Sequence, residues 1–425
     1  MKVVLITVAC LSVSVTVGAA VRESVRAQTA ATEFPILPTA GPPVVTPAEP
    51  APPPTSAPPA SPTQEPNRHP VSGFLHPGIG VSLDHLEGVR AHINAGAQPW
   101  AEAYRAMARS QYADLGWSPQ AREVVECGLY SNPDRGCGDE WRDAVAAYTH
   151  ALLWYLTLNQ DHARKAVEII DAWSATLRAH THDNAPLQAG WSAATLVRAA
   201  EIMRYTYAGW PAANLERAAT MFRDVYLPLL RNGAPRSDGN WDFIILDAAM
   251  GIAVFLDDRP LFDHVVGLWR ARLPAYIYLE SDGPRPVRPP AGSVNWYGLT
   301  TYVDGVTQET CRDLGHTAWG LEALAQIAET AWIQGIDLYA EAQPRLTAAL
   351  ELHAGYALGD PVPDWLCNGT LKDKFEPIPE IAYHHYHHRL GLDLPRTRQL
   401  LQTNRPQPAS HFYAWGTLTH GAPPR

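Results

Sequence analysis

Apolar and polar positions follow a helical period over most of the chain. Apolar residues recur at i, i+3, i+4 spacing in 138–157, 162–180, 190–210, 214–233, 242–258, 259–277 and 317–335, and a polar-aromatic segment follows at 378–391. Gly, Pro and Asn residues punctuate these segments, as they do where helices end. Because strand-like alternation is scarce, the pattern predicts an all-α protein with roughly a dozen helices.

Helices of about ten to twenty residues joined by short loops are typical of helical hairpins, either stacked as a solenoid or closed into an α/α toroid. No repeat is visible at the residue level, which argues against a regular repeat protein. The chain has 14 Trp and 17 Tyr, many of them near predicted helix ends. These aromatics either fill a large core or stack on sugar rings at a rim. We favour an α/α toroid, an incomplete barrel of hairpins with a long substrate cleft.

The N-terminal part of the chain has a different composition. Residues 1–28 predict a signal peptide, because Met1-Lys2 precede an apolar run that ends in small residues. The run is long enough for a retained membrane anchor, but its Ser and Thr favour the signal peptide. Residues 29–70 are rich in Pro, Ala, Ser and Thr and predict a disordered linker. Residues 71–425 then form the predicted folded domain of a secreted protein, which the linker could associate with the cell surface.

Four cysteines follow the predicted signal peptide: Cys127, Cys137, Cys311 and Cys367. An even number in an exported chain predicts two disulfides, and four cysteines allow three pairings. We favour Cys127–Cys137, which bracket a turn-rich segment, and Cys311–Cys367. A zinc site is the alternative, but the chain has no CxxC pair to support it.

The formal net charge is −10, and the chain has no basic run. Phosphate binding needs clustered Lys and Arg, so this composition argues against a nucleic acid partner. An acidic substrate held by a few cations in a cleft remains compatible with it.

The segment "RSDGNWDF" (236–243) holds the first candidate residues. Asp238-Gly239 is a turn signal, and Asn240 then opens a strongly apolar helix. Asn240 is either a helix cap or an amide donor beside the free N–H groups of a helix start, where a carboxylate can bind.

The segment "ETCRDLGH" (309–316) holds the second group. Arg312 and His316 lie on one face if the helix begins by Arg312. Arg is suited to a carboxylate and His to proton transfer, while Glu309 or Asp313 could orient either one. The alternative is a salt bridge and a hydrogen-bonded His at a helix start.

Two tyrosines, Tyr297 and Tyr302, lie just upstream in a Gly/Thr-rich loop. Tyr297 near Arg312 would have a lowered pKa and could act as a base. The alternative is that such a tyrosine stacks on substrate or packs the loop.

The segment "EIAYHHYHHRLG" (380–391) is the third candidate. On a helix, His384 and His388 face one way and His385 another, and no HExxH pattern is present, so we do not expect a metal. One face of this helix, either Tyr383 with Tyr386 or His385 with Arg389, is expected to touch a cleft. The chain also has no GxSxG motif, phosphate-binding Gly loop or dinucleotide fingerprint.

The chain resembles the alginate-lyase-like superfamily of polysaccharide lyases, and within it the alginate or glucuronan lyase group. The resemblance rests on "NWDF" (240–243), "QETCRDLGHTAWGLEALAQIAETAWIQGIDLY" (308–339) and "EIAYHHYHHRLGLDLP" (380–395), and it also covers 73–100 and 143–173. It implies an α/α toroid with a long cleft and no metal or cofactor.

The resemblance also implies roles for individual residues. Asn240 matches a carboxylate-binding Asn and Arg312 a cleft Arg. Trp241 stands where the family has a His, and His316 falls near a Tyr-His pair, so the base is either His316 or a tyrosine such as Tyr297. His385 is a further candidate for proton transfer. The residues expected to bind substrate are His182, Gln188, Trp241, Tyr302, Glu309 and Tyr386.

The function implied is a secreted lyase that cleaves 4-linked polyuronates, glucuronan or alginate, by β-elimination and leaves 4,5-unsaturated ends. One alternative is a glycoside hydrolase, which would need two opposed carboxylates from Asp238, Asp304 or Glu309. The other is a catalytically inactive sugar-binding protein at the cell surface. We expect an anionic polysaccharide as partner, no nucleic acid, no membrane after signal cleavage, and a monomer.

Overall fold

The structure is a computed structural model that describes residues 68–289 and 295–422. All of these residues belong to one unit, Pro62–Arg425. The predicted signal peptide and nearly all of the predicted linker lie outside the described residues. Of the linker's last residues, Arg68 forms a β-bridge with Leu75 and the His69 amide donates to the Phe74 carbonyl at 2.7 Å.

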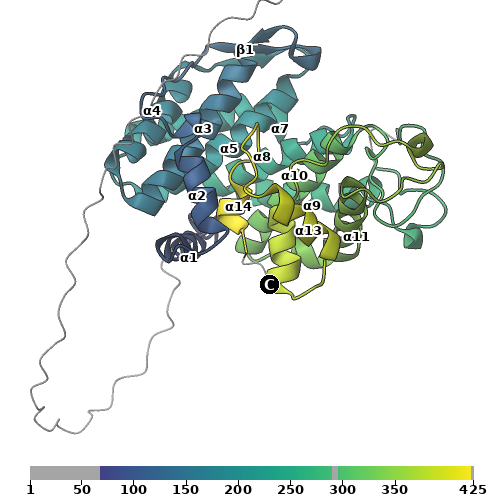
Figure 1. Ribbon diagram of the computed structural model, residues 1–425. Helices are drawn as coiled ribbons and strands as arrows, with labels where there is room; N and C mark the ends of the chain where they lie inside the picture. The colour runs from purple at the N-terminus through teal and green to yellow at the C-terminus, as the bar shows by residue number, and fades with distance from the viewer. Residues whose placement is uncertain (1–67, 290–294, 423–425) are drawn as a thin grey trace, which may run out of the picture. The chain divides into compact units, whose positions relative to one another are not determined.

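The described residues form two layers of helices (Figure 1). The inner helices are neighbours in a closed sequence: each contacts the next, and the last contacts the first. In this order they are α3 (Cys137–Thr157), α5 (Ala185–Thr206), α8 (Gly239–Phe255), α10 (Leu314–Ile333), α12 (Glu380–Tyr383), α14 (Gly416–His420) and α1 (Leu83–Asn94). This closed ring of hairpins confirms the predicted α/α toroid.

The outer helices pack against the inner ring. They are α4 (Gln160–Thr176) against α3, α6 (Ala212–Met221) against α4, α7 (Leu227–Leu230) against α5 and α8, α9 (Arg259–Tyr276) against α8, α11 (Leu338–Ala357) against α10, and α13 (Pro395–Asn404) against α11. α2 (Trp100–Ala108) packs on α1 and α14. Sequence composition explains the two layers: α8 is apolar and buried almost throughout, whereas α4 exposes one charged face.

Two predicted helices differ in detail. The 214–233 segment changes to a π-helix over Phe222–Tyr226 before α7, because Pro228 has no N–H to continue the α-helical bonding. The 378–391 segment begins as α12 and continues as a π-helix over His384–Arg389. Helix α11 was not among the predicted segments.

A small sheet lies beside α3 and α5. Its strand order is β2-β1-β3, where β1 is Val124–Cys127, β2 is Asp134–Arg135 and β3 is Ala179–Thr181. β1 pairs antiparallel with β2 and parallel with β3. Both predicted disulfides are confirmed, Cys127–Cys137 with Cα atoms 5.9 Å apart and Cys311–Cys367 with Cα atoms 5.0 Å apart.

The long connection between α9 and α10 carries much of the candidate site. Tyr278, Leu299 and Val306 form a small apolar cluster of its own with Leu366, and the Cys311–Cys367 disulfide holds its end. Gly305 has a φ of +90°, and a Cβ there would lie 2.5 Å from the Ala348 backbone. Only glycine lets the connection pass this close to α11.

Glycines also set the spacing of α8 and α10 near their N-termini. A Cβ on Gly239 or on Gly320 would lie 2.0 Å from an atom of the Tyr276 side chain. The fully buried Tyr276 ring therefore fits between the two helices only because both positions lack a side chain.

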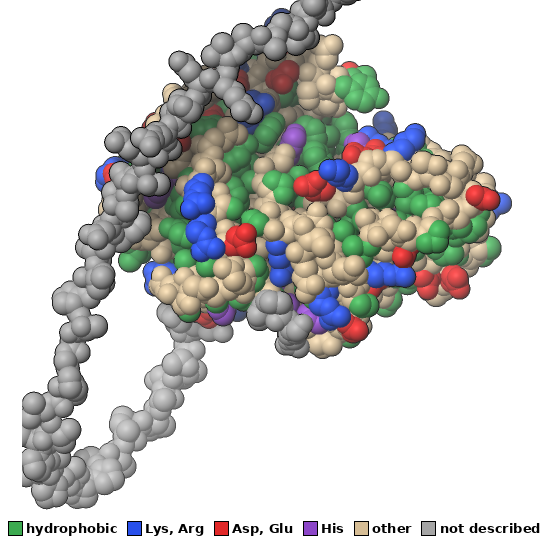
Figure 2. All heavy atoms as spheres, in the orientation of Figure 1, with side chains coloured by type: hydrophobic (Ala, Val, Ile, Leu, Met, Phe, Trp, Pro, Cys, Tyr) green, Lys and Arg blue, Asp and Glu red, His purple; other side chains and the backbone are tan. Residues whose placement is uncertain are grey.

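No helix in the described part of the chain is long and apolar enough to cross a membrane. Basic and acidic side chains are interspersed over the face shown in Figure 2. On that face, an acidic ligand would therefore meet individual Lys or Arg side chains and not an extended basic patch.

Candidate active site

The N-termini of four inner helices meet at one end of the ring. The Gln188 side chain of α5 donates to the Cys137 carbonyl at the start of α3 at 3.0 Å. A Cβ on Gly190 of α5 would lie 3.3 Å from the Ile244 side chain of α8, and Asn240 of α8 bonds to Glu309 just before α10. The positive ends of four helix dipoles therefore lie together, which favours anions there.

Asn240 and Arg312 converge on one carboxylate, that of Glu309. The Asn240 amide nitrogen Nδ2 and Arg312 Nη1 both donate to Glu309 Oε1, the latter at 2.9 Å, and the Asn240 backbone N–H donates to Oε2 at 3.0 Å. Asn240 and Glu309 are 1% and 0% exposed. We expected both to bind substrate directly; in the structure both are buried, and Glu309 links Asn240 to the Arg312 guanidinium.

The pKa of Glu309 is raised to about 7. Burial is the main cause, and the nearby Asp238 carboxylate raises the pKa further, whereas Arg312 and His316 lower it. Glu309 thus lies close to both Arg312 and His316, and with this pKa its carboxyl group gains or loses a proton near neutral pH.

Arg312 is the part of this group that reaches solvent. Its side chain is 24% exposed, and its ion pairs with Glu309 and with Asp238, the latter at 3.5 Å, both use Nη1. A guanidinium has five donors, so Arg312 retains donors for a second carboxylate.

Tyr297 lies beside Arg312 but not in the state that we predicted. Its hydroxyl donates to Asp238 Oδ2. Burial and this hydrogen bond raise the pKa of Tyr297, although Arg312 acts in the opposite direction. The predicted lowering of the pKa is therefore wrong, because burial of the phenol and its hydrogen bond to Asp238 outweigh the effect of the guanidinium.

His316 and Asp313 form a hydrogen-bonded pair at the start of α10. Asp313 caps the helix by accepting the His316 backbone N–H at 2.7 Å, and its carboxylate also bonds to His316 Nδ1 at 2.7 Å. Burial raises the pKa of Asp313, but the bonds from His316 outweigh it and lower the pKa overall. With Nδ1 held by Asp313, Nε2 is the nitrogen that can exchange protons with a ligand.

His316 lies on a cavity, and its side chain is 38% exposed. The cavity has a volume of about 240 Å³ and is lined by His316 with Gly315, Trp319, Asp373, Lys374, Glu376 and Tyr413. The helix begins at Leu314, so Arg312 precedes it and the i, i+4 argument for a shared face does not apply. Arg312 and His316 are nevertheless close, since both act on Glu309.

An aromatic row continues from this cavity along the helix N-termini. We define it as Trp141 of α3, Trp191 of α5, Trp319 of α10, and His411. Trp141 stacks on His411 at 4.5 Å, and Trp191 lies 4.7 Å from His411 and 5.8 Å from Trp319, centroid to centroid. All four are partly exposed. Such rings offer apolar faces to sugar rings.

Trp241, in the first turn of α8 next to Asn240, is also partly exposed. We did not single out the members of the aromatic row from the sequence. A usable signal was present, because Trp141, Trp191, Trp241 and Trp319 all fall within the first two turns of an inner helix.

Several predicted residues do not join this group. His385 stacks on Tyr339 and contacts Trp332 near the C-terminal end of α10, about 24 Å along that helix from His316. Tyr386 is fully buried and donates to the Tyr339 carbonyl at 2.8 Å. Helical periodicity predicted which residues of 380–391 share a helix face. It could not predict at which end of the ring this segment lies.

Three other predicted residues have different surroundings. Tyr302 packs in the loop cluster, with Trp296 at 5.5 Å. Gln188 is buried and bonds to Glu140 at 2.7 Å. His182 is half exposed, with Glu126 at 3.7 Å as its ion-pair partner.

Among the described residues, the side chains with the spacing of metal ligands lie outside this candidate site. The one group there with three suitably spaced ligands is His85, Glu329 and His420, which does not include any residue of the Glu309 group.

The comparisons with known proteins identify relatives. Residues 98–363, more than half of the chain, match the family described as Alginate lyase. Alginate lyase A1-III from Sphingomonas species A1 is similar in structure, with a TM-score of 0.56 and 18% identity over 84% of this chain and 99% of that one. An alginate lyase from Bacteroides ovatus has a TM-score of 0.58 and 14% identity, with 81% of this chain and 99% of that one covered. No curated protein matches the chain by sequence.

A variant of A1-III in complex with a tetrasaccharide is also similar, with a TM-score of 0.58 and 18% identity over 84% of this chain and 99% of that one. At these identities the solved structures establish the shared fold.

Proposed function

The chain belongs to the alginate lyase family and is a polysaccharide lyase, and from this premise we propose that it cleaves 4-linked polyuronates by β-elimination at Arg312 and His316. One observation carries the proposal. Arg312 and Asn240 converge on a single carboxylate oxygen, beside a His316–Asp313 pair that opens on a cavity.

β-Elimination requires removal of the proton on C5 of a uronate, next to its carboxylate. That proton is very weakly acidic while the carboxylate keeps its full charge, so the enzyme must stabilise the enolate-like charge that develops. Preorganised donors supply this stabilisation, and the loss of one typically costs about 3 kcal/mol. Arg312 is placed to bind the substrate carboxylate, while Asn240 and Glu309 fix the guanidinium from behind.

His316 is the proposed base. Its Nε2 takes the C5 proton, the C5–H electron pair forms the C4=C5 double bond, and the C4–O4 bond breaks. The imidazolium then returns the proton to O4, and Asp313 stabilises the charged ring meanwhile. Tyr297 is less suited to be the base, because burial and Asp238 raise its pKa.

The aromatic row is the proposed sugar-binding wall. It extends from Trp319, on the His316 cavity, to Trp141. Stacking on partly exposed rings would align several sugars of a chain past His316. Both alginate and glucuronan provide the 4-linked uronate that this arrangement needs.

Export is part of the proposal. The N-terminal run and the two disulfides support a secreted enzyme, since disulfides persist in oxidising compartments.

A glycoside hydrolase fits the arrangement less well. It would need two carboxylates acting across a sugar, whereas Asp238 and Glu309 both face the same guanidinium. Glu309 is moreover fully buried.

The experiment is a comparison of Arg312→Ala and His316→Ala with the wild type on polymannuronate, polyguluronate and glucuronan. Formation of the unsaturated ends is followed by ultraviolet absorbance. Each variant should lose at least about 100-fold in kcat while its circular dichroism stays unchanged. Arg270→Ala and His264→Ala, which change exposed residues of the outer helix α9, are matched controls and should keep wild-type rates. Full activity of both site variants would refute the assignment.

A further inference from the structure

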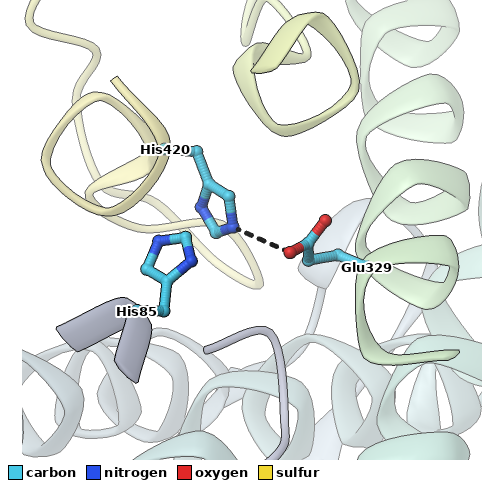
Figure 3. A group of neighbouring side chains, drawn as sticks. All are labelled: His85, Glu329 and His420. Carbon is cyan, nitrogen blue, oxygen red and sulfur yellow. Dashed lines mark ion pairs between the residues drawn. The ribbon is translucent and has the colours of Figure 1, made fainter. Parts of the chain in front are cut away.

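The ring closes at a seam where helices from both ends of the described chain meet. α1 and α14 contact each other there, and α12 contacts both α14 and α10. His85 of α1, His420 of α14 and Glu329 of α10 point into the same space (Figure 3). Their ligand atoms all lie within 4.8 Å of one another.

Each of the two histidines has one ring nitrogen held by Thr419. His85 Nε2 lies 2.5 Å from the Thr419 carbonyl, so Nε2 is the donor and Nδ1 carries the lone pair. His420 Nδ1 lies 2.9 Å from the Thr419 hydroxyl, whose own proton is directed to the carbonyls of Trp415 and Gly416. His420 Nδ1 is therefore a donor too, and its Nε2 carries the lone pair. Metal-bound histidines are oriented in this way.

Two ring nitrogens at this seam are buried and make no hydrogen bond in the described structure. His420 is 2% exposed, and its Nε2 has no hydrogen-bond partner. His384 of the adjacent π-helix contributes a second unpaired buried nitrogen, Nδ1, with its ring 5.7 Å from that of His420 and 6.1 Å from that of His85. A buried polar atom without a partner is costly, and a bound ion would remove this cost.

Glu329 has room for one more ligand on the oxygen that faces the histidines. A carboxylate offers about four lone-pair sites. Oε2 accepts from Arg389 at 2.8 Å and from Tyr339 at 3.2 Å, while Oε1 accepts only from Arg389, at 2.7 Å, among the described contacts. Oε1 lies 3.5 Å from His420 Nε2.

These distances fit a tetrahedral zinc ion. Ligand bonds of about 2.0 Å at tetrahedral angles place ligand atoms about 3.3 Å apart and the centroids of two bound imidazoles about 5 Å apart. The rings of His85 and His420 are 4.6 Å apart. The ligand atoms of His85, His420 and Glu329 already lie within 4.8 Å of one another, so small side-chain rotations would bring these three groups to one point.

We propose that His85, His420 and Glu329 bind one Zn²⁺ ion, which links α1, α14 and α10 where the ring closes. This departs from our expectation of no metal, because the ligands come from segments that are far apart in the sequence. The ion has a structural role, since Glu329 lies about 20 Å along α10 from His316.

The competing explanation is a metal-free ion pair. His420 Nε2 and Glu329 Oε1, which lie 3.5 Å apart, could pair with each other directly. In that case the seam would bind no zinc, and chelators would leave its stability unchanged.

The test uses the full chain without a polyhistidine tag. Zinc content is measured by mass spectrometry on the protein as purified, and again after chelator treatment and titration with ZnCl₂. The proposal expects one zinc per chain and a melting temperature that falls by several degrees on chelation and recovers with zinc. His85→Gln and His420→Gln should each weaken zinc binding at least about 100-fold. His264→Gln, on the outer helix α9, is the control and should bind like the wild type.

Two results would overturn the proposal. One is wild-type protein that neither contains zinc nor gains melting temperature when zinc is added, a measurement that does not depend on any variant folding. The other is one zinc per chain that persists unchanged in both His85→Gln and His420→Gln, which would place the metal elsewhere.

Discussion

Replacement of Glu309 by glutamine should make the protein's stability less dependent on pH. The pKa of Glu309 is about 7 in the folded protein, against 4.5 in the unfolded chain. Between these values the folded state holds a proton that the unfolded state has lost, so wild-type stability falls as pH rises through this window. From pH 5 to pH 8 the loss due to Glu309 is about 2.5 kcal/mol. The Glu309→Gln variant escapes this loss, because an amide side chain does not titrate.

Urea unfolding at pH 5 and pH 8 measures this difference. The unfolding free energy of Glu309→Gln, minus that of the wild type, should rise by about 2.5 kcal/mol between the two pH values. Burial raises the pKa of Glu322 to about 8. Because Glu322 is present in both proteins, its contribution cancels when the two unfolding free energies are subtracted. Glu341→Gln removes an exposed carboxylate that also pairs with an arginine, and should show almost no such change. If the difference in unfolding free energy between Glu309→Gln and the wild type is the same at both pH values, the raised pKa of the buried Glu309 is refuted.

Three further outcomes are expected. Asp313→Asn should lower kcat about 10- to 100-fold and shift the pH–rate profile, because His316 loses its partner; an unchanged profile would argue against that role. Removal of the Cys311–Cys367 disulfide should cost about 1.5 kcal/mol more in urea unfolding than removal of Cys127–Cys137, because it closes 56 rather than 10 residues. Trp191→Ala should raise KM about 3- to 10-fold for long oligosaccharides and less for short ones; equal effects would exclude a stacking role.

Most of the toroid could be predicted from the sequence because its longer helices have a clear period. Helices α8 and α10 each carry an almost continuous apolar surface, and their segments were identified. The helices that close the ring could not be identified from periodicity. Closure depends on α12 and α14, which are four and five residues long, too short to show a period.

The candidate site shows the same division. The motif resemblance brought Asn240 and Arg312 together, and the structure joins them through Glu309. The sequence did not reveal that Glu309 would be buried between them, because its position depends on an irregular connection packed over α11. For the same reason, the effect of Asp238 on Tyr297 was missed. Pairwise contacts between loops leave no periodic signal in a single sequence.

The central claim is that Arg312 and His316 break a uronate linkage by elimination rather than by hydrolysis. Its most direct test counts reducing ends and C4=C5 double bonds in the same reaction of the wild-type protein with alginate and with glucuronan. Elimination predicts one double bond for every new reducing end on at least one of these polymers. New reducing ends without ultraviolet absorbance would contradict the account.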